Sequence, residues 1–239
     1  MSTVPEIARV RAGDLTVAYR TWGPESAPPL ILLHGLTSSG AAWEAVARAL
    51  ASDWRVYAPD ARGHGRTDWP GEYSFASMAA DVGNFAAALR LRRPVLIGHS
   101  MGGIAAYRHA RAVGDGLAAL VLSETPPPTP IQRPLPPRPD GPQSYDYDAR
   151  VAVVRQLAEP DPGWWDGLAD IAVPTLVIGG GDTSPFDQDL MAAMAERIPN
   201  GRFASLPGGH RIPATAPAEL AAAVTEFLST TIDLGQNKT

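Results

Sequence analysis

The chain has 239 residues, of which 45% are hydrophobic and 19% charged, and its formal net charge is −5. This length suits one domain with a sizeable core, and the composition is that of a soluble globular protein rather than a disordered chain. The acidic balance removes the electrostatic basis for binding nucleic acid or an anionic membrane, so neither is expected as a partner. The lack of cysteine excludes disulfides, thiolate catalysis and cysteine-ligated metals.

The two ends of the chain indicate no targeting signal. Residues 1–10 contain Glu6 and Arg9 and lack the apolar segment of a secretory signal. No stretch reaches the ~18 apolar residues needed to span a bilayer. We therefore expect a single cytoplasmic domain over residues 1–239, with a frayed polar tail at about 230–239.

Seven short runs along the chain have the pattern of β-strands. The first, at residues 15–21, alternates polar and apolar side chains and predicts an antiparallel edge strand. The others, in chain order, lie at residues 30–33, 55–58, 95–97, 117–122, 175–178 and, less regularly, 202–206. Most of them are apolar throughout, which suits strands that are covered on both faces of a parallel sheet.

Helical patterns lie between these runs. Residues 75–91 place Met78, Val82 and Phe85 on one face, behind Ser74 as a possible N-cap. Further helices are predicted at residues 41–51, 101–111, 188–198 and 217–228. This alternation of strands and helices predicts the α/β class, a doubly wound and mostly parallel sheet with helices on both faces. Ligands of such sheets bind at the carboxyl ends of the strands.

The segment at about residues 124–173 breaks the alternation. Nine of the 18 residues at 125–142 are proline, which excludes a regular helix or a central strand there. Compact domains seldom carry so long a connection without a use. We predict a lid over the active-site edge, with one helix around residues 148–157, and keep a proline-rich linker as the alternative.

The strongest chemical signal is the segment GHSMGG at residues 98–103. It follows an apolar strand and precedes an alanine-rich helix, and in that setting a tight turn lifts the Ser100 hydroxyl above the sheet. Gly98 and Gly102 supply the small residues that the turn requires two positions before and after the serine. Ser100 is therefore the predicted nucleophile, with an ordinary glycine-rich turn as the alternative.

A serine hydroxyl needs a base to become nucleophilic at neutral pH, and five histidines are available. His210 follows the last predicted strand in the segment PGGH at 207–210, from which it can reach over the strand tips to Ser100. Of the others, His34 and His64 are better suited to structural roles in their turns. The sharp turn should point His99 away from Ser100, and His109 should lie two to three turns along the following helix, away from the strand tips. His210 is the predicted general base.

The base in turn needs a carboxylate that holds its tautomer and stabilises its cation. Asp182 follows the strand at 175–178 through three glycines and keeps the chain order Ser, Asp, His. Asp182 is the predicted acid. The competitors are Glu124, at the tip of an earlier strand, and two aspartates near Asp182, Asp187 and Asp189, of which Asp187 is better suited to cap the following helix.

The oxyanion of the reaction needs two backbone donors. The Met101 N–H lies at a helix N-terminus, and the Leu36 N–H lies in the loop after the strand at 30–33, where Gly35 allows close approach. Candidate substrate-binding residues are Leu36, Met101, Trp43, Tyr145, Trp164, Trp165, Phe186 and Ile212. Core packing is the alternative for each aromatic side chain and is favoured for Trp43.

Together these motifs resemble the α/β-hydrolase superfamily over about residues 14–229. The matching elements are HGL at 34–36, DARGHGRT at 60–67, GHSMGG at 98–103, the GxxD pattern at 179–182 and GGH at 208–210. The resemblance implies an eight-stranded, mostly parallel sheet, a lid inserted after the sixth strand and acyl-enzyme chemistry at Ser100. It also implies Leu36 and Met101 as oxyanion donors, and neither a cofactor nor a metal.

Three functions follow from this interpretation. The first is hydrolysis of a small carboxylic ester or lactone, with a small molecule as the only expected partner. The second keeps the triad but changes the bond, as in thioesterases, C–C bond hydrolases and perhydrolases. The third is a non-catalytic binding protein with the same fold. Ser100 argues against epoxide hydrolases and haloalkane dehalogenases, which resemble this chain but use an aspartate at that position.

Overall fold

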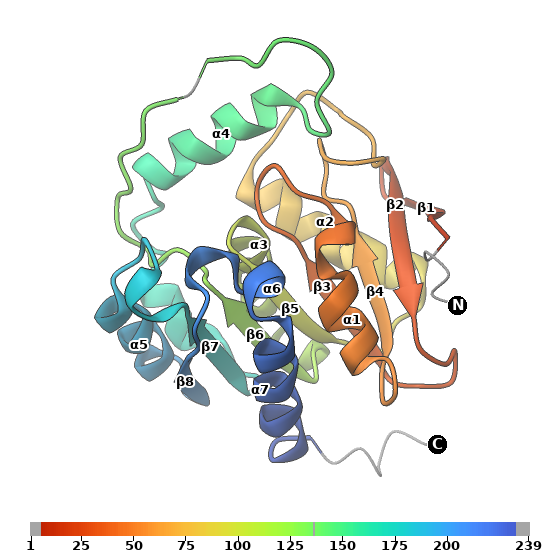
Figure 1. Cartoon of the computed structure of the whole chain (residues 1–239), viewed down its shortest axis with the longest axis vertical. Coiled ribbons are helices and arrows are strands. Elements are labelled where there is room, and N and C mark those ends of the chain that lie inside the picture. Colours follow the sequence, from red (N-terminus) through yellow and green to blue (C-terminus); the bar gives the residue numbers. More distant parts are fainter. Residues whose placement is uncertain (1–5, 136, 233–239) are drawn as a thin grey trace.

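The computed structural model describes residues 6–135 and 137–232, so most of the predicted polar tail and residues 1–5 lie outside the described residues. Its centre is one eight-stranded sheet with the order β1-β2-β4-β3-β5-β6-β7-β8 (Figure 1). The strands are β1 (Ala8–Ala12), β2 (Leu15–Trp22), β3 (Pro29–Leu33), β4 (Arg55–Pro59), β5 (Val95–His99), β6 (Ala119–Ser123), β7 (Thr175–Gly179) and β8 (Gly201–Ser205).

The sheet is mostly parallel, which confirms the predicted fold class. The six strands β4, β3, β5, β6, β7 and β8 run parallel to one another, whereas β2 pairs antiparallel with both β1 and β4. The prediction that residues 15–21 form the edge strand is wrong, because β1 lies outside β2. A two-residue turn at Gly13 and Asp14 joins the two strands, and the positive φ of Gly13, 62°, suits such a hairpin.

Helices cover both faces of the sheet. Figure 1 shows α1 (Glu44–Leu50), α6 (Ile212–Thr215) and α7 (Pro217–Ser229) in front of the sheet, and α2 (Phe75–Ala88) and α3 (Met101–Val113) behind it. The helix α5 (Gln188–Arg197) packs its two buried methionines into the same apolar cluster as α2 and α3. The predicted helix at 41–51 is divided into a 3₁₀ turn, Gly40–Trp43, and α1.

Buried side chains alternate between the two faces of the central strands. On β5, Leu96 packs toward α2 and α3, whereas Val95 and Ile97 pack toward α1 and α7. Strand β6 repeats this arrangement with Leu120 on one face and Val121 on the other. This double burial explains the continuous apolar runs in the sequence, and it fixes the carboxyl ends of the strands at one rim.

The connection between β6 and β7 rises over that rim and contains α4 (Tyr147–Ala158) (Figure 1). It is attached to the turn at residues 60–67 by two backbone hydrogen bonds, from Gly65 N–H to the Ser144 carbonyl and from Asp146 N–H to the Gly63 carbonyl, both 2.7 Å. The Tyr73 hydroxyl donates to the Asp146 carboxylate at 2.6 Å. These contacts hold α4 above the carboxyl ends of the strands.

A search of residues 6–135 and 137–232 found no helix that is both long enough and apolar enough to cross a membrane.

Candidate active site

Ser100 lies in the turn between β5 and α3. Its backbone has φ 53° and ψ −118°, a sparsely populated conformation for a residue with a side chain. Two hydrogen bonds hold the turn, from Ser100 N–H to the Ser123 carbonyl at 3.1 Å and from Gly103 N–H to the Ser100 carbonyl at 2.9 Å. The strain is therefore balanced by the surrounding backbone, and the side chain lines a cavity above the sheet.

The glycines around Ser100 are required by close backbone approach. A Cβ atom at Gly98 would lie 2.6 Å from the Gly103 Cα atom, and one at Gly102 would lie 2.6 Å from the Leu33 carbonyl carbon. Both distances are shorter than Cβ atoms tolerate in proteins. Gly98 is thus required by the close approach of the first turn of α3, and Gly102 by the close approach of the end of strand β3.

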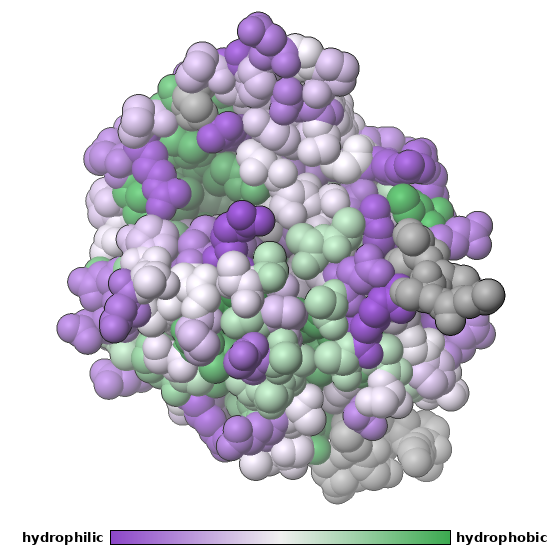
Figure 2. Space-filling view, viewed as in Figure 1, coloured by the Kyte–Doolittle hydropathy of each residue, from purple (hydrophilic) through white to green (hydrophobic). Residues whose placement is uncertain are grey.

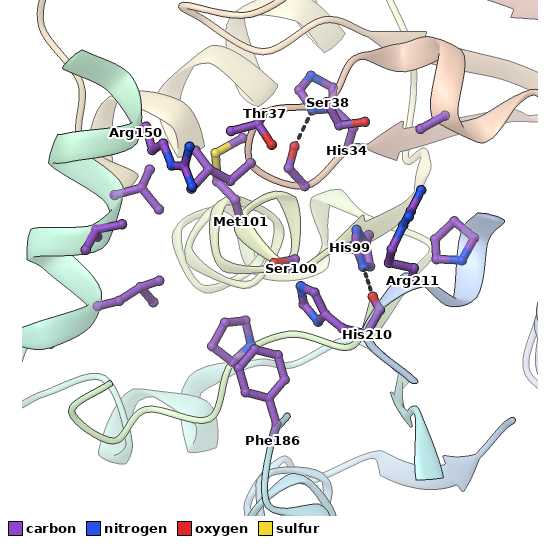
Figure 3. Close-up of a pocket in the computed structure, with 18 of the residues that line it drawn as sticks. His34, Thr37, Ser38, His99, Ser100, Met101, Arg150, Phe186, His210 and Arg211 are labelled. Carbon is purple, nitrogen blue, oxygen red and sulfur yellow. Dashed lines mark hydrogen bonds between the residues drawn. The ribbon is translucent and has the colours of Figure 1, made fainter. Parts of the chain in front are cut away.

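His210 lies beside Ser100 at the same cavity. Figure 3 shows the His210 ring and the Ser100 hydroxyl next to one another at its floor. The described structure has no hydrogen bond between them. Such contacts are often long without substrate and tighten when substrate is bound. The roles predicted for both residues rest on this placement.

The carboxylate that contacts His210 is Glu124 rather than Asp182. Glu124 Oε2 lies 3.2 Å from His210 Nδ1, and the Glu124 side chain is fully buried. Asp182 is exposed in a 3₁₀ turn, Gly181–Thr183, and makes no hydrogen bond or ion pair within the described chain. The prediction of Asp182 is corrected to Glu124, which follows β6, the neighbour of both β5 and β7.

Two further groups hold the Glu124 carboxylate. Oε1 accepts from Gly180 N–H at 2.5 Å, and the Ser184 hydroxyl lies 2.8 Å from Oε2 and 3.0 Å from Oε1. The glycine segment at the end of β7, residues 179–181, therefore donates an N–H to Glu124, and it does not place the Asp182 carboxylate at His210. A Cβ atom at Gly180 would lie 2.6 Å from the Gly209 carbonyl carbon, so this approach also requires glycine. Because Glu124 accepts hydrogen bonds, it favours the His210 tautomer with hydrogen on Nδ1.

The His210 backbone is supported from below by His99. The His99 Nε2–H donates to the His210 carbonyl at 2.6 Å, and the two rings lie 5.0 Å apart (Figure 3). On another side, the Phe186 ring contacts the His210 ring edge-on at 5.0 Å. Glu124, His99 and Phe186 together restrict the imidazole to an orientation in which Nε2 is left for a reacting group.

The loop after β3 lies close to Ser100 and is held by hydrogen bonds to the Gly35 carbonyl. His34 Nδ1–H donates to the Gly35 carbonyl at 2.8 Å, and Ser38 N–H donates to the same oxygen at 3.3 Å (Figure 3). In a trans peptide the N–H points opposite to the carbonyl, so the Leu36 N–H points away from His34. A Cβ atom at Gly35 would lie 3.3 Å from Ser100 Cβ and closer still to His99. Gly35 thus lies close to Ser100, and the role of the Leu36 N–H as an oxyanion donor stays a prediction.

A second histidine holds the next residue of that loop. Thr37 N–H donates to His64 Nε2 at 3.2 Å, and His64 Nδ1–H donates to the Arg62 carbonyl at 3.0 Å. Thr37 has a positive φ of 62°, which is unusual for a β-branched residue. Burial lowers the pKa of His64, so the ring stays neutral and accepts this bond at pH 7.

The cavity above Ser100 has a volume of about 440 Å³. Figure 2 shows a hollow with an apolar floor beneath α4 and hydrophilic residues on its rim. Of the predicted substrate-binding residues, Leu36, Trp43, Met101 and Phe186 line it. Trp43 is also nearly fully buried against α1, as its core alternative predicted. The Met101 N–H begins helix α3 and has no partner inside that helix.

Four predicted substrate-binding residues lie elsewhere. Trp164 is buried and stacks on the Tyr107 ring at 5.3 Å, and Trp165 packs beside the same core cluster. Tyr145 stacks on the His64 ring at 6.2 Å, and Ile212 is fully buried against α1 and α7. These four predictions are corrected, because the core of the β6–β7 connection, the turn at His64 and, for Ile212, the helices α1 and α7 cover these side chains.

Sequence reasoning missed several residues of this site. It gave Glu124 only as an alternative, and it gave no role at the cavity to Arg133 or Arg150. The sequence feature that could have identified Glu124 is its position directly after β6, the strand next to β5. Arg150 lies three residues before Val153 on α4, so both face the cavity through the helical period, and only the position of α4 reveals it.

Among residues 6–135 and 137–232, no group of three or more His, Asp or Glu side chains is placed to hold a metal ion.

A family model described as alpha/beta hydrolase fold matches residues 28–158, more than half of the chain. The chain belongs to this family. Among individual proteins, the chain is similar to a non-heme chloroperoxidase of Streptomyces lividans. The two are 38% identical over 147 residues, which are 60% of this chain and 52% of that protein. A 3-hydroxybutyrate-oligomer hydrolase of Cupriavidus necator is 34% identical over 131 residues, 52% of this chain and 42% of that protein.

This alpha/beta hydrolase thus spans about half the length of the curated relatives it matches. A solved structure of a thermophilic esterase from Thermogutta terrifontis, with malate bound, aligns with a TM-score of 0.78 at 24% identity. The alignment covers 95% of this chain and 99% of that one. At this identity the likeness shows a common fold.

The buried histidines of this alpha/beta hydrolase make its stability depend on pH. Burial, then the charge of His210, lowers the pKa of His99 from 6.5 to about 4, and burial lowers the pKa of His34 to about 3. The unfolded chain therefore binds more protons below pH 6.5. We expect the free energy of unfolding to fall as the pH drops from 6.5 toward 4, by up to ~1.4 kcal/mol per pH unit for each histidine.

Urea denaturation at a series of pH values measures this slope. The variant His99→Gln removes one titrating group while offering an amide donor near the His210 carbonyl, so its unfolding free energy should vary less steeply with pH in this range. If the unfolding free energy varied equally steeply with pH in the wild type and in His99→Gln, His99 would take up its proton over the same pH range in the folded and in the unfolded chain.

Proposed function

We propose that this alpha/beta hydrolase cleaves a small carboxylic ester or lactone through an acyl-enzyme at Ser100. The observation that carries the proposal is that the buried Glu124 contacts His210 Nδ1 while the His210 ring lies beside Ser100. A serine in a strained turn with an oriented imidazole next to it is suited to nucleophilic catalysis. No part of this arrangement uses Asp182.

Each residue has a defined step. His210 Nε2 takes the proton of the Ser100 hydroxyl as its oxygen attacks the acyl carbon, and Glu124 stabilises the imidazolium that forms. The Leu36 and Met101 N–H groups donate to the oxyanion. His210 then gives the proton to the leaving alcohol. Water attacks the acyl-enzyme, His210 takes its proton, and the acid leaves as Ser100 regains its hydrogen.

The size of the cavity favours a substrate with a small acyl or alcohol group. Its volume of about 440 Å³ lies near the lower end of the range for small-molecule sites, and apolar side chains of α4 face Ser100 across it. The connection that carries α4 acts in this proposal as a lid, which excludes water from the reacting carbonyl.

Two measurements test the function. A fluorophosphonate probe should label the protein once, and mass spectrometry of the digested protein should find the adduct on Ser100. A panel of nitrophenyl esters of increasing acyl length, with lactones and thioesters, should show turnover that falls for acyl groups too large for the cavity. No adduct and no turnover of any ester would reject the proposal in favour of a non-catalytic binding role.

A second candidate is perhydrolysis, which the likeness to a protein named non-heme chloroperoxidase favours. In that reaction hydrogen peroxide replaces water in the attack on the acyl-enzyme and releases a peracid. Measuring peracid formation from acetate and hydrogen peroxide, beside ester hydrolysis by the same protein, separates the two.

A further inference from the structure

The cavity above Ser100 is positively charged in a protein of net negative charge. Three arginines line it, Arg133, Arg150 and Arg211, and its lining residues include neither aspartate nor glutamate. The whole chain has a formal net charge of −5. Within residues 6–135 and 137–232, none of the three arginines forms an ion pair. The cavity therefore concentrates cationic groups without their own counter-ions.

Arg150 is the arginine best placed to meet a substrate. It lies on α4, is half-buried, and extends from that helix toward Thr37 and Met101 across the cavity (Figure 3). Its hydrogen-bond partner in the described structure is the neutral Tyr145 hydroxyl, at 3.3 Å. A guanidinium has five donors, so most of them are left for a ligand.

Other arginines of the protein show what Arg150 lacks. Arg62, which is more buried than Arg150, makes a two-pronged contact with Asp81 at 2.6 and 2.7 Å. Arg138, on the same connection as Arg150, pairs with Asp148 at 2.7 Å. A guanidinium stays charged at any physiological pH, and a charge at an apolar cavity is stabilised by an opposite charge.

The cavity around Arg150 is otherwise apolar on the side of α4. Val153, Val154 and Leu157 line that side, and Met101 lies opposite. On the far side of Ser100, Arg133 lies over the Phe186 ring, with its guanidinium carbon 5.8 Å from the ring centre. Phe186 in turn contacts His210. Two guanidinium groups thus belong to the cavity lining, Arg150 on α4 and Arg133 beside Phe186.

We propose that the substrate carries an anionic oxygen group, a carboxylate or a phosphate, which Arg150 binds while Arg133 adds to the attraction. This inference rests on the proposed ester hydrolysis and names its substrate class. Arginine matches both anions geometrically because its fork donates two parallel hydrogen bonds. The substrate would be an ester with this group on the part that extends from Ser100 toward α4.

The test compares two nitrophenyl esters of equal chain length, the hemiglutarate, which has a free carboxylate, and the valerate, which has none. The wild-type protein should have the higher kcat/KM for the hemiglutarate. In Arg150→Leu this preference, the ratio of the two kcat/KM values, should fall by about 10- to 100-fold. Arg150→Lys, which keeps the charge but not the fork, should give an intermediate preference.

Arg138→Leu is the matched control. It removes the same charge from the same connection, but Arg138 is exposed and pairs with Asp148 outside the cavity. Its preference for the hemiglutarate should equal that of the wild type. An equal loss in Arg138→Leu and Arg150→Leu would overturn the proposal, since it would trace the preference to overall charge.

Binding without turnover separates this inference from the proposed function. Calorimetry with Ser100→Ala should detect glutarate or inorganic phosphate, and the stronger binder identifies the anion. If no ester is hydrolysed but either anion binds only when Arg150 is present, the anion site stands and the esterase proposal fails. If the valerate is hydrolysed as well as the hemiglutarate and neither anion binds, the esterase proposal stands and the anion site is rejected.

Discussion

Replacing Ser100 with alanine is expected to lower kcat for ester hydrolysis by about a million-fold, because His210 would have no hydroxyl beside it to activate for the formation of the acyl-enzyme. The loss should appear in kcat with KM little changed, since the substrate contacts of α4 and Phe186 remain. Steady-state rates on a nitrophenyl ester measure both constants. The slow residual rate would come from the oxyanion donors and the bound geometry.

The Ser100→Ala variant also removes a strained residue, so its fold is the required control. Alanine at φ 53° has the same backbone penalty as serine, and the melting temperature should therefore change little. It should also lose fluorophosphonate labelling completely. A variant that keeps wild-type turnover while its label disappears would show that hydrolysis proceeds without an acyl-enzyme at this serine.

Replacing Glu124 with glutamine is expected to lower kcat by about ten-thousand-fold. The glutamine keeps the volume and its oxygen still accepts from Gly180 N–H, but its NH₂ group then faces His210 Nδ1. That contact favours the tautomer with hydrogen on Nε2, which cannot accept the Ser100 proton. Measurement of kcat with a nitrophenyl ester checks the size of the loss.

Asp182→Asn is the matched control for Glu124→Gln. Asp182 is exposed and has no contact with His210, so kcat and stability should stay at wild-type values. Both variants remove one carboxylate charge near the same strand ends. A large loss in Asp182→Asn with normal activity in Glu124→Gln would restore Asp182 as the acid and would require a rearrangement of the loop after β7.

Glu124 also stabilises the fold through its backbone. Its φ is 45°, and its N–H donates to the Ile178 carbonyl at 2.8 Å, which continues the pairing of β6 with β7 by one residue. Unfolding curves of Glu124→Gln are therefore needed beside its kinetics. A folded variant with low kcat and an unchanged KM assigns the loss to His210 rather than to the sheet.

Much of the fold could be predicted because its signals are local. Continuous apolar runs such as those of β5 and β6 identify strands that are buried on both faces, and the alternation with helices indicates a parallel sheet. Strand β1 was not predicted, since its five residues alternate arginine with small apolar side chains and its existence depends on pairing with β2. Short charged strands of this kind are typical of sheet edges.

The sequence by itself determined the turn around Ser100, because the strand, the small residues and the helix that form it follow one another directly in the chain, and Gly98 meets a steric demand from Gly102 and Gly103. It also placed His210 after the last strand, at the rim where strand ends meet. Only the tertiary structure decided between Glu124 and Asp182, which follow neighbouring strands, β6 and β7. Gly180 N–H and the Ser184 hydroxyl hold the Glu124 carboxylate against the imidazole. These contacts join segments that are far apart in the sequence, so no local pattern predicts them. The unpaired charge of Arg150 was hidden for the same reason, since no local pattern tells whether an arginine finds a partner.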